Sequence, residues 1–326
     1  VALLNPKQEN CNYPFKDLCG CGVGFKLLQA ICLQTGHEPE LAYQYLDLVA
    51  IASAADIVPL LGENRLITKL GLELINSAPR PGIQHLLDQG KRTGVVETSD
   101  LVFAVAPRIN AAGRLAHASL AVELLSQTDV DLAKEKALYI ENINTERRSL
   151  DQQITEEALS LLENEKEKLT TVVCQENWNK GVVGIVASRL IETYYRPTMV
   201  LCQDGDTIVG SVRSVSGFDV HAVLVAIQDL FVNFGGHQYA AGVTLKANRL
   251  EELKNRFEEE VSKKITKEQL VQKIKIESIL SPNDLLRDKK SEPYPKLYRL
   301  IEQLAPFGPG NMRPVFVMEN LEDAGD

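Results

Sequence analysis

Residues 140–161 read IENINTERRSLDQQITEEALSL, and they predict one long amphipathic helix that divides the chain. Apolar residues recur in it at spacings of three, four and seven, which places them along one narrow face of a helix. These residues are Ile140, Ile143, Leu150, Ile154 and Leu161. No glycine or proline interrupts residues 115–179. A helix of this kind commonly joins two domains, so we expect a domain on either side of it.

Downstream of this helix, short apolar strands alternate with helical segments, a pattern typical of an α/β domain. We expect strands at 171–174, 197–202, 207–214 and 243–245, and helices at 181–190, 219–231 and 250–265. In the third of these strands the two-residue period places Ser211 and Arg213 on the same face.

The stretch Phe234–Gly242, FGGHQYAAG, follows the helix expected at 219–231 and reads as a tight glycine-rich turn. Gly235 and Gly236 permit unusual backbone angles and close approach of a ligand to main-chain N–H groups. His237 adds a donor that is neutral or charged near pH 7. Two interpretations stay open at this point: a socket for a phosphate or nucleotide, and a plain turn with a packed histidine.

Upstream of the long helix, the periodicity predicts helices rather than strands. Helices are expected at 23–33, 41–53, 63–75 and 83–87, and residues 101–106 fit either a strand or a helix. Asp47 and Asp56 are isolated acids in the apolar run 46–60. A buried carboxylate needs a cation, a metal ion or several N–H donors. Asp47 is therefore either a capping or hydrogen-bonded core acid, or a metal ligand.

Residues 107–115, PRINAAGRL, place two arginines around a small-residue loop that leads into a helix. Arginine presents a rigid fork of donors that suits phosphate, and small residues permit close backbone approach. Arg108 and Arg114 are thus candidates for phosphate binding. The alternative is a helix start with solvated arginines.

The composition is that of a globular protein large enough for two or three domains. The chain has 326 residues, of which 44% are hydrophobic and 24% charged. The net charge of −9 means that any contact with nucleic acid must use a local basic groove. No apolar run has membrane-spanning length and no signal peptide is recognisable, so we expect no membrane partner.

The six cysteines indicate a reducing compartment rather than a metal site. Only Cys19 and Cys21 are close in sequence, and no second pair matches their spacing. Small buried thiols explain this usage better than a structural zinc site, so we expect a cytoplasmic protein.

The residues after 266 form the start of a further unit. Ile274 and Ile276 alternate as in a strand, a charged helix follows, and Leu304–Asn311 reads LAPFGPGN before a strand at 315–317. The unit looks incomplete.

Taken together, several stretches resemble one family in their order along the chain. They are Asp47–Leu60, Pro107–Leu115, Trp178–Leu190, Ser211–Arg213, Gly235–Gly242 and Pro306–Asn311. This order is similar to that of the RecJ family, the single-stranded-DNA-specific 5′→3′ exonucleases of the DHH phosphoesterase superfamily. The resemblance implies an α/β multidomain protein. Its parts would be the C-terminal part of a DHH catalytic domain (1–128), a long interdomain helix (129–167), an α/β DHHA1 substrate-binding domain (168–266) and part of an OB-like nucleic-acid-binding domain (267–326).

The same resemblance implies metal-dependent hydrolysis of phosphodiesters, in DNA repair and recombination, with two Mn²⁺ or Mg²⁺ ions. Asp47 matches one metal-ligand position. Single-stranded DNA is the implied partner, and other replication or repair proteins stay undefined. The residues implied in substrate binding are Arg108, Asn110 and Arg114 toward the DNA backbone, and Ser211, Arg213, Gly235, Gly236 and His237 toward a phosphate.

The chain also departs from the family pattern. No two histidines are adjacent, so the Asp-His-His motif is absent, and Asn5-Pro6-Lys7 resembles the stretch that follows it. We therefore expect a fragment that lacks the N-terminal motifs and does not cleave DNA by itself. Asn179 stands where many relatives carry histidine, and its role stays open, as does that of Asp56. The alternatives are a DHH-family phosphoesterase acting on nanoRNA or small nucleotides, and a non-catalytic DNA-binding relative.

Overall fold

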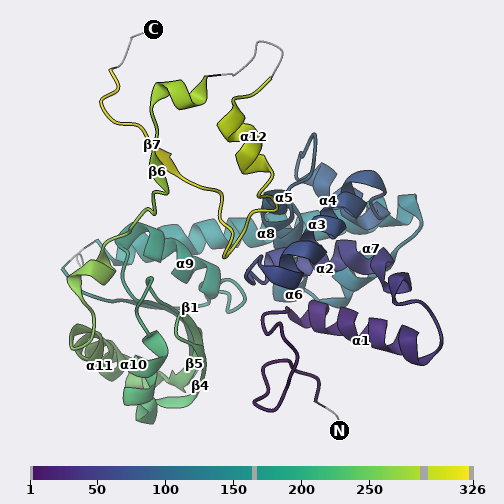
Figure 1. Ribbon diagram of the computed structural model, residues 1–326. Helices are drawn as coiled ribbons and strands as arrows, with labels where there is room; N and C mark the ends of the chain where they lie inside the picture. Colours follow the sequence, from purple (N-terminus) through teal and green to yellow (C-terminus); the bar gives the residue numbers. More distant parts are fainter. Residues whose placement is uncertain (1–2, 164–166, 287–292, 323–326) are drawn as a thin grey trace. The chain divides into compact units, whose positions relative to one another are not determined.

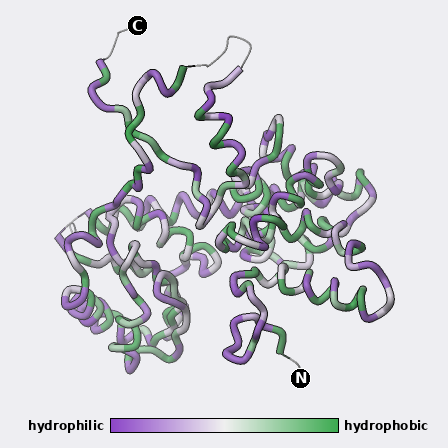
Figure 2. Tube along the Cα trace, in the orientation of Figure 1, coloured by the Kyte–Doolittle hydropathy of each residue, from purple (hydrophilic) through white to green (hydrophobic). Residues whose placement is uncertain are grey.

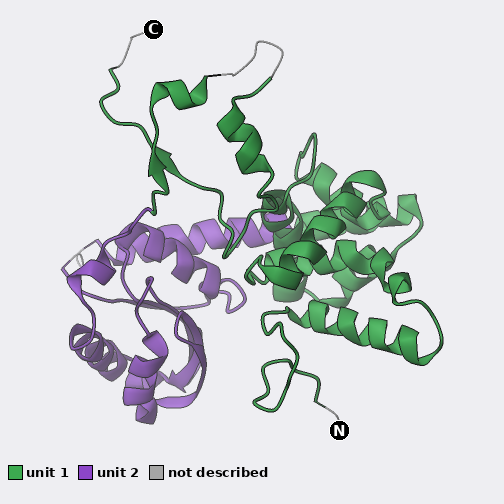
Figure 3. Cartoon of the chain, in the orientation of Figure 1, with its two compact units in different colours: residues 1–143, 275–326 green, residues 144–274 purple. Residues whose placement is uncertain are grey.

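The computed structural model describes residues 3–163, 167–286 and 293–322 (Figure 1). The chain is a mixed α/β protein with two compact units (Figure 3). Unit 1 contains residues 1–143 and 275–326, and unit 2 contains residues 144–274. The boundary at residue 143 falls inside a helix, where the sequence predicted a separate connector. Within the described residues, no helix combines the length and the apolar character needed to cross a membrane.

Unit 1 is built almost entirely of helices in its N-terminal part. They are α1 (Gly20–Gln34), α2 (Leu46–Ala55), α3 (Gly62–Ser77), α4 (Pro81–Gln89), α5 (Thr98–Asp100), α6 (Ala106–Leu115) and α7 (Ser119–Ser126). Residues 39–45 form a 3-10 helix, and residues 101–105 form a π-helical turn that runs into α6. The helices expected near 23–33, 63–75 and 83–87 are present, and the one expected at 41–53 divides into the 3-10 helix and α2.

The stretch 107–115 is not a loop, as the sequence suggested, but most of helix α6. Pro107 follows directly after the π-helical turn 101–105, and such a turn is a common way for a helix to accommodate the N–H that proline lacks. Ala111 and Ala112 are buried, and alanine is the best helix former. Small residues that suggested a phosphate loop therefore allow close helix packing instead.

The long helix predicted from the sequence is confirmed as α8 (Val130–Leu161). In unit 1 it buries Ala133, Ala137 and Ile140 against the helical core. In unit 2 it buries Ile154 and Ala158, about four turns further along the same helix. One amphipathic helix thus supplies core residues to both units.

Unit 2 contains a five-stranded sheet with the order β1-β2-β3-β5-β4. Its strands are β1 (Thr171–Glu176), β2 (Thr198–Asp204), β3 (Thr207–Arg213), β4 (Phe231–His237) and β5 (Ala240–Lys246). Strands β1 and β2 are parallel and joined by α9 (Val183–Tyr194), whereas the other neighbours are antiparallel. This arrangement follows the alternation seen in the sequence.

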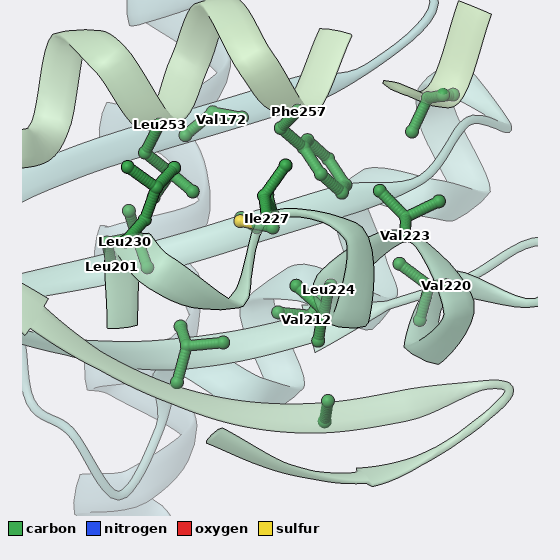
Figure 4. Packing of buried hydrophobic residues seen from close by; sticks show 14 of the residues in the cluster. Val172, Leu201, Val212, Val220, Val223, Leu224, Ile227, Leu230, Leu253 and Phe257 are labelled. Carbon is green, nitrogen blue, oxygen red and sulfur yellow. The ribbon is translucent and has the colours of Figure 1, made fainter. Parts of the chain in front are cut away.

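One face of this sheet carries the core of unit 2 (Figure 4). Val212, Val243 and Leu245 point to it from β3 and β5. The helices α10 (Val220–Ala226) and α11 (Leu250–Ser262) cover this face with residues such as Leu224 and Phe257. Side chains alternate along a strand, so Ser211 and Arg213 point to the opposite face. Gly184 of α9 lies against both of them, which places the start of α9 on that opposite face.

The Gly-Gly-His stretch lies in strand β4. This corrects the expectation that it forms a turn after a helix at 219–231. Helix α10 ends at Ala226 instead of Phe231, and Phe231–His237 pairs with β5. The turn itself falls at Gln238 and Tyr239. Pairing with a strand that comes later in the chain overrides the local preference of glycine for turns.

The C-terminal residues of unit 1 pack on the junction between α2 and α3. The backbone N–H of Leu60 donates to Pro309 O at 2.6 Å, and Arg65 Nη2 donates to Leu304 O at 2.8 Å. A Cβ at Gly308 would overlap the side chain of Leu60, so glycine is required for this approach.

The remaining described part of this segment has little regular structure. It contains β6 (Ser278–Ile279), α12 (Lys296–Glu302) and β7 (Phe316–Val317), with β6 and β7 paired in parallel. Hydrophobic residues recur along it (Figure 2), and several are exposed, among them Ile276, Ile279 and Leu286. The described residues thus form one short strand pair, and an OB-like unit stays a prediction.

An ion pair buried in unit 2 gives a stability prediction. Asp151 of α8 is fully buried, and its carboxylate accepts three hydrogen bonds from Arg189 of α9, at 2.7–3.0 Å. Arg189→Ala removes all three hydrogen bonds and leaves the buried carboxylate the longer contact with Arg147 Nη1, at 3.8 Å, so it is expected to destabilise the chain. Asp151→Leu removes the charge and the acceptor oxygens and is also expected to destabilise it. For Arg189→Ala we expect a loss of about 3–5 kcal/mol, measured by urea unfolding.

The exposed acid Glu156 on the next turn of α8 is the control. Glu156→Ala is expected to change the free energy of unfolding by less than about 0.5 kcal/mol. Equal losses of unfolding free energy in Arg189→Ala and Glu156→Ala would show that the Asp151–Arg189 ion pair does not stabilise the chain.

Candidate functional site

The register of the sheet in unit 2 gathers the predicted phosphate-binding residues in two rows. Ser211, Gly242 and Gly235 are partners across β3, β5 and β4. Arg213, Ala240 and His237 form the next row. Residues in register across a sheet point to the same side, so both rows lie on the face opposite the core.

The strands β4 and β5 present a floor without side chains between these rows. A Cβ added at Gly235 would meet no atom within 4 Å, and one at Gly242 would meet only Gly210 O at 4.0 Å. Glycine weakens the interior of a strand, and neither position needs it for packing or for a left-handed backbone. These two glycines leave room for a ligand to approach the main chain.

The third glycine of this region, Gly236, has a different role. Its Cβ would overlap Ala240 O and the Cα of Ala241, so the pairing of β4 with β5 requires glycine there. The structure therefore gives Gly236 a structural role. Gly242, at the end of the motif, takes its place as a candidate, because a Cβ there would meet open space.

The start of helix α9 borders this floor. A Cβ at Gly184 would lie 3.1 Å from both Ser211 Oγ and Arg213 Nη2. Arg213 Nη1 donates to Ser211 Oγ at 2.7 Å and to Val212 O at 2.9 Å, which holds the guanidinium against the sheet. The positive end of the α9 dipole thus lies beside an arginine, an arrangement that favours an anion.

Asn179 has a structural role in the loop before α9. Its Oδ1 accepts a hydrogen bond from Gly181 N at 2.8 Å, and its backbone O accepts from Val182 N and Val183 N. Asparagine is well suited to such a local turn. The loop therefore receives its conformation from Asn179.

His237 presents a donor to solvent at the end of β4. Its Nδ1 accepts a hydrogen bond from Tyr239 N at 3.3 Å, so the neutral ring carries its proton on Nε2. The side chain is exposed. Together, Arg213, Ser211 and His237 supply donors around a floor of backbone, which suits a phosphate or phosphodiester group better than an apolar ligand.

The three residues predicted in unit 1 have different environments on α6. Asn110 and Arg114 are exposed and four residues apart, so they lie on the same face of the helix. Arg108 is 2% exposed; its Nε lies 2.6 Å from Glu141 Oε2, and its Nη atoms donate to Ala104 O and Gln89 O. The structure thus gives Arg108 a role in packing α6, in place of the predicted phosphate contact.

Asp47 is buried, as the sequence predicted for an acid in an apolar run, and its partner is an arginine. It is 1% exposed, with Arg80 Nε 2.7 Å from its Oδ2 and Leu48 N 2.8 Å from its Oδ1. Arg80 also donates to Gln44 O and stacks on Tyr45. Asp56, in contrast, is exposed at the end of α2, not buried in that run.

The described residues do not fit a metal site around Asp47. They contain no group of three or more His, Cys, Asp or Glu side chains that could hold a metal ion. Mn²⁺ and Mg²⁺ need several oxygen ligands, and here one carboxylate is already neutralised by a guanidinium. Asp47 is at most one ligand of a site whose other ligands come from elsewhere.

Comparison with known proteins agrees on one family. A model for the DHHA1 domain matches residues 154–263. The single-stranded-DNA-specific exonuclease RecJ of Bacillus subtilis is 38% identical over 99% of this chain and 40% of its own length. The enzyme of the same name from Escherichia coli is 33% identical over 97% of this chain and 57% of its own. The chain spans about half the length of the curated relatives it matches.

Solved structures are similar over nearly the whole chain. The crystal structure of RecJ from Thermus thermophilus in complex with Mn²⁺ matches with a TM-score of 0.83 and 30% identity, over 94% of this chain and 44% of that one. The Mg²⁺ complex from the same organism matches with a TM-score of 0.80.

The environment of Asp47 leads to a metal-binding prediction. We expect Mn²⁺ to change the melting temperature of the wild-type chain and of Asp47→Asn by the same amount, because Arg80 already occupies the carboxylate. Thermal unfolding with and without Mn²⁺ measures this. Asp56→Asn, at the exposed end of the same helix, is the control. A stabilisation by Mn²⁺ that is lost in Asp47→Asn and kept in Asp56→Asn would contradict the prediction.

Proposed function

We propose that this chain, which belongs to the RecJ family, forms the part of a single-stranded-DNA exonuclease that holds the DNA strand. The observation that carries the proposal is the face of unit 2 with Arg213, Ser211 and His237 around the floor made by Gly235 and Gly242. A phosphate group fits donors of this kind, and a backbone floor admits a strand whose bases are not constrained in sequence.

The activity of the whole protein follows from its family. Its relatives are named single-stranded-DNA-specific exonucleases, and solved relatives contain Mn²⁺ or Mg²⁺. We propose 5′→3′ hydrolysis of single-stranded DNA with Mn²⁺ or Mg²⁺, in DNA repair and recombination, and a cytoplasmic location. Asp47 is the one residue of this chain that we propose as a metal ligand of the complete enzyme.

The two units contribute different contacts in this proposal. Unit 2 binds a terminal or scissile phosphate through Ser211, Arg213 and His237. In unit 1, Asn110 and Arg114 on the exposed face of α6 contact the DNA backbone, and Arg108 supports that helix from inside the core. The acidic total charge confines DNA to these local donors.

We propose that the chain by itself binds single-stranded DNA without cleaving it, since the described residues lack a cluster of metal ligands. Mn²⁺-dependent hydrolysis that disappears in Asp47→Ala would contradict this. The similarity to exonucleases does not favour the alternatives of a small-nucleotide phosphoesterase or a non-catalytic relative. Comparing a long single strand with a dinucleotide as ligands separates the first alternative from our proposal.

The proposed site predicts which side chains contribute to the affinity for DNA. Arg213→Ala and His237→Ala should each weaken binding of a 5′-phosphorylated oligothymidylate, Arg213→Ala by about tenfold or more, as for loss of a charged hydrogen bond. Arg213→Ala should also reduce the slope of log affinity against log salt concentration by about one, since one phosphate contact is lost. Fluorescence anisotropy at several salt concentrations measures both.

Arg256→Ala is the matched control for charge, because Arg256 lies on α11, at the core face of the sheet, and pairs with Asp229. It should bind DNA nearly as the wild type does. Unchanged affinity in both Arg213→Ala and His237→Ala would refute the site.

The glycine floor gives an independent prediction. Gly235→Ala and Gly242→Ala should lower the same affinity by about tenfold, a cost of about 1.4 kcal/mol, because a methyl group fills the space of the ligand. Neither should destabilise the chain, and each could gain up to about 1 kcal/mol from strand propensity. Anisotropy and urea unfolding measure the two effects.

Gly236→Ala is the contrasting variant, because its methyl group overlaps Ala240 O; it should lose stability. Unchanged DNA affinity in stable Gly235→Ala and Gly242→Ala variants would show that the floor is not the binding surface.

A further inference from the structure

The loop between β1 and α9 is anchored by a tryptophan. Trp178 is 5% exposed, and its Nε1 donates to Glu157 Oε2 of α8 at 2.7 Å. The loop starts at Asn177, whose positive φ of 67° turns the chain out of β1. The anchor therefore follows directly after the point where the chain changes direction.

Both oxygens of the Glu157 carboxylate are held in place. Oε2 accepts from Trp178, and Oε1 accepts from Gln153 Nε2, one turn earlier in α8, at 2.9 Å. These two hydrogen bonds, that from Trp178 first, lower the pKa of Glu157. Cys202 Sγ of β2 also donates to the backbone O of Trp178, at 2.6 Å. The ring of Trp178 is thus fixed to α8 and its backbone to the sheet.

The position of this loop determines where α9 begins. Asn179, the residue after Trp178, accepts the hydrogen bonds that start the helix, and Gly184 then lies against Ser211 and Arg213. Since a Cβ at Gly184 would be only 3.1 Å from the two polar side chains, a small shift of the loop changes the spacing of the helix start and the arginine.

We propose that Glu157 is a positioning residue for the phosphate site of unit 2. Glu157 holds Trp178 in place, and Trp178 in turn holds the start of α9. The spacing between the start of α9 and the side chains of Ser211 and Arg213 then allows the helix start and these side chains to contact the same phosphate. The inference rests on the proposed function and adds to it a residue of the long helix, outside the motifs that suggested the site.

Glu157 is suited to a test because its side chain is exposed, unlike that of Asp151, whose loss endangers the fold. Its neighbour Glu156 provides a matched control. Glu156 is also exposed and accepts from Gln152 at 2.9 Å, as Glu157 accepts from Gln153. The two acids differ in the bond to Trp178.

The experiment compares Glu157→Ala, Glu157→Gln and Glu156→Ala in the full chain, by anisotropy with oligothymidylates that carry a 5′-phosphate or a 5′-hydroxyl. Glu157→Ala should lose about tenfold in affinity for the phosphorylated strand, as expected for a lost hydrogen bond to a charged acceptor. Glu157→Gln retains an acceptor oxygen and should bind as the wild type does, and so should Glu156→Ala. Glu157→Gln and Glu156→Ala should melt as the wild type does, whereas Glu157→Ala, which leaves the buried indole N–H without its acceptor, should melt a few degrees lower and stay folded at the assay temperature.

A second readout follows the anchor itself. Trp178 is the single tryptophan of the chain, so its indole N–H gives one identifiable NMR resonance and its fluorescence reports this loop alone. The resonance should shift in Glu157→Ala and stay in place in Glu157→Gln and Glu156→Ala.

Three outcomes would overturn the inference: wild-type affinity in Glu157→Ala, equal effects of Glu157→Ala and Glu156→Ala, or an unshifted indole resonance in Glu157→Ala. The proposed function fails separately. If the wild-type chain itself does not bind the oligothymidylates, the phosphate site is refuted, and the indole resonance still decides whether Glu157 positions the loop.

Discussion

The carboxylates of helix α8 are the constraint on which the rest of unit 2 depends. Asp151 cannot be buried without a cation, and Arg189 of α9 satisfies it with three hydrogen bonds. Six residues further along α8, Glu157 holds Trp178. Helix α9 is therefore fixed to α8 near its start and at its middle. The side of α9 that faces the sheet has little freedom left, and that side meets Ser211 and Arg213.

Unit 1 also contains an ion pair between an acid of α8 and a buried arginine of a neighbouring helix. Glu141, on the earlier part of α8, neutralises the buried Arg108, and α6 consequently presents Asn110 and Arg114 to solvent. In both units a buried ion pair on α8 decides which face of a neighbouring helix is exposed. An amphipathic helix with a narrow apolar face can form such ion pairs on two sides. Acids that flank the apolar face lie at the edge of the core, where arginines of the helices packed against it can reach them.

The sequence predicted the elements whose evidence is local. Periodicity located α8 and most helices of unit 1, and alternation located the parallel strands of unit 2. The sequence could not assign interactions whose partner is distant in the chain. Arg108 looked like a phosphate ligand because Glu141 could not be assigned to it, and the partner of Asp47 is Arg80, 33 residues away. The Gly-Gly-His stretch is a different case, because its partner β5 follows after a two-residue turn; the adjacent glycines, which favour turns, suggested the turn at Gly235 and Gly236 and not at Gln238 and Tyr239.

The glycines show how structure separates two causes that look the same in a sequence. Gly235 and Gly236 are adjacent, and both fit a phosphate motif. A side chain at Gly236 would collide with β5, so folding alone explains it, whereas one at Gly235 or Gly242 would meet open space. Selection for folding gives no reason to keep glycine at these two positions, where it weakens a strand. The ligand that we propose against the backbone there would account for both glycines, and the donors of Ser211, Arg213 and His237 beside them are the reason for proposing a phosphate.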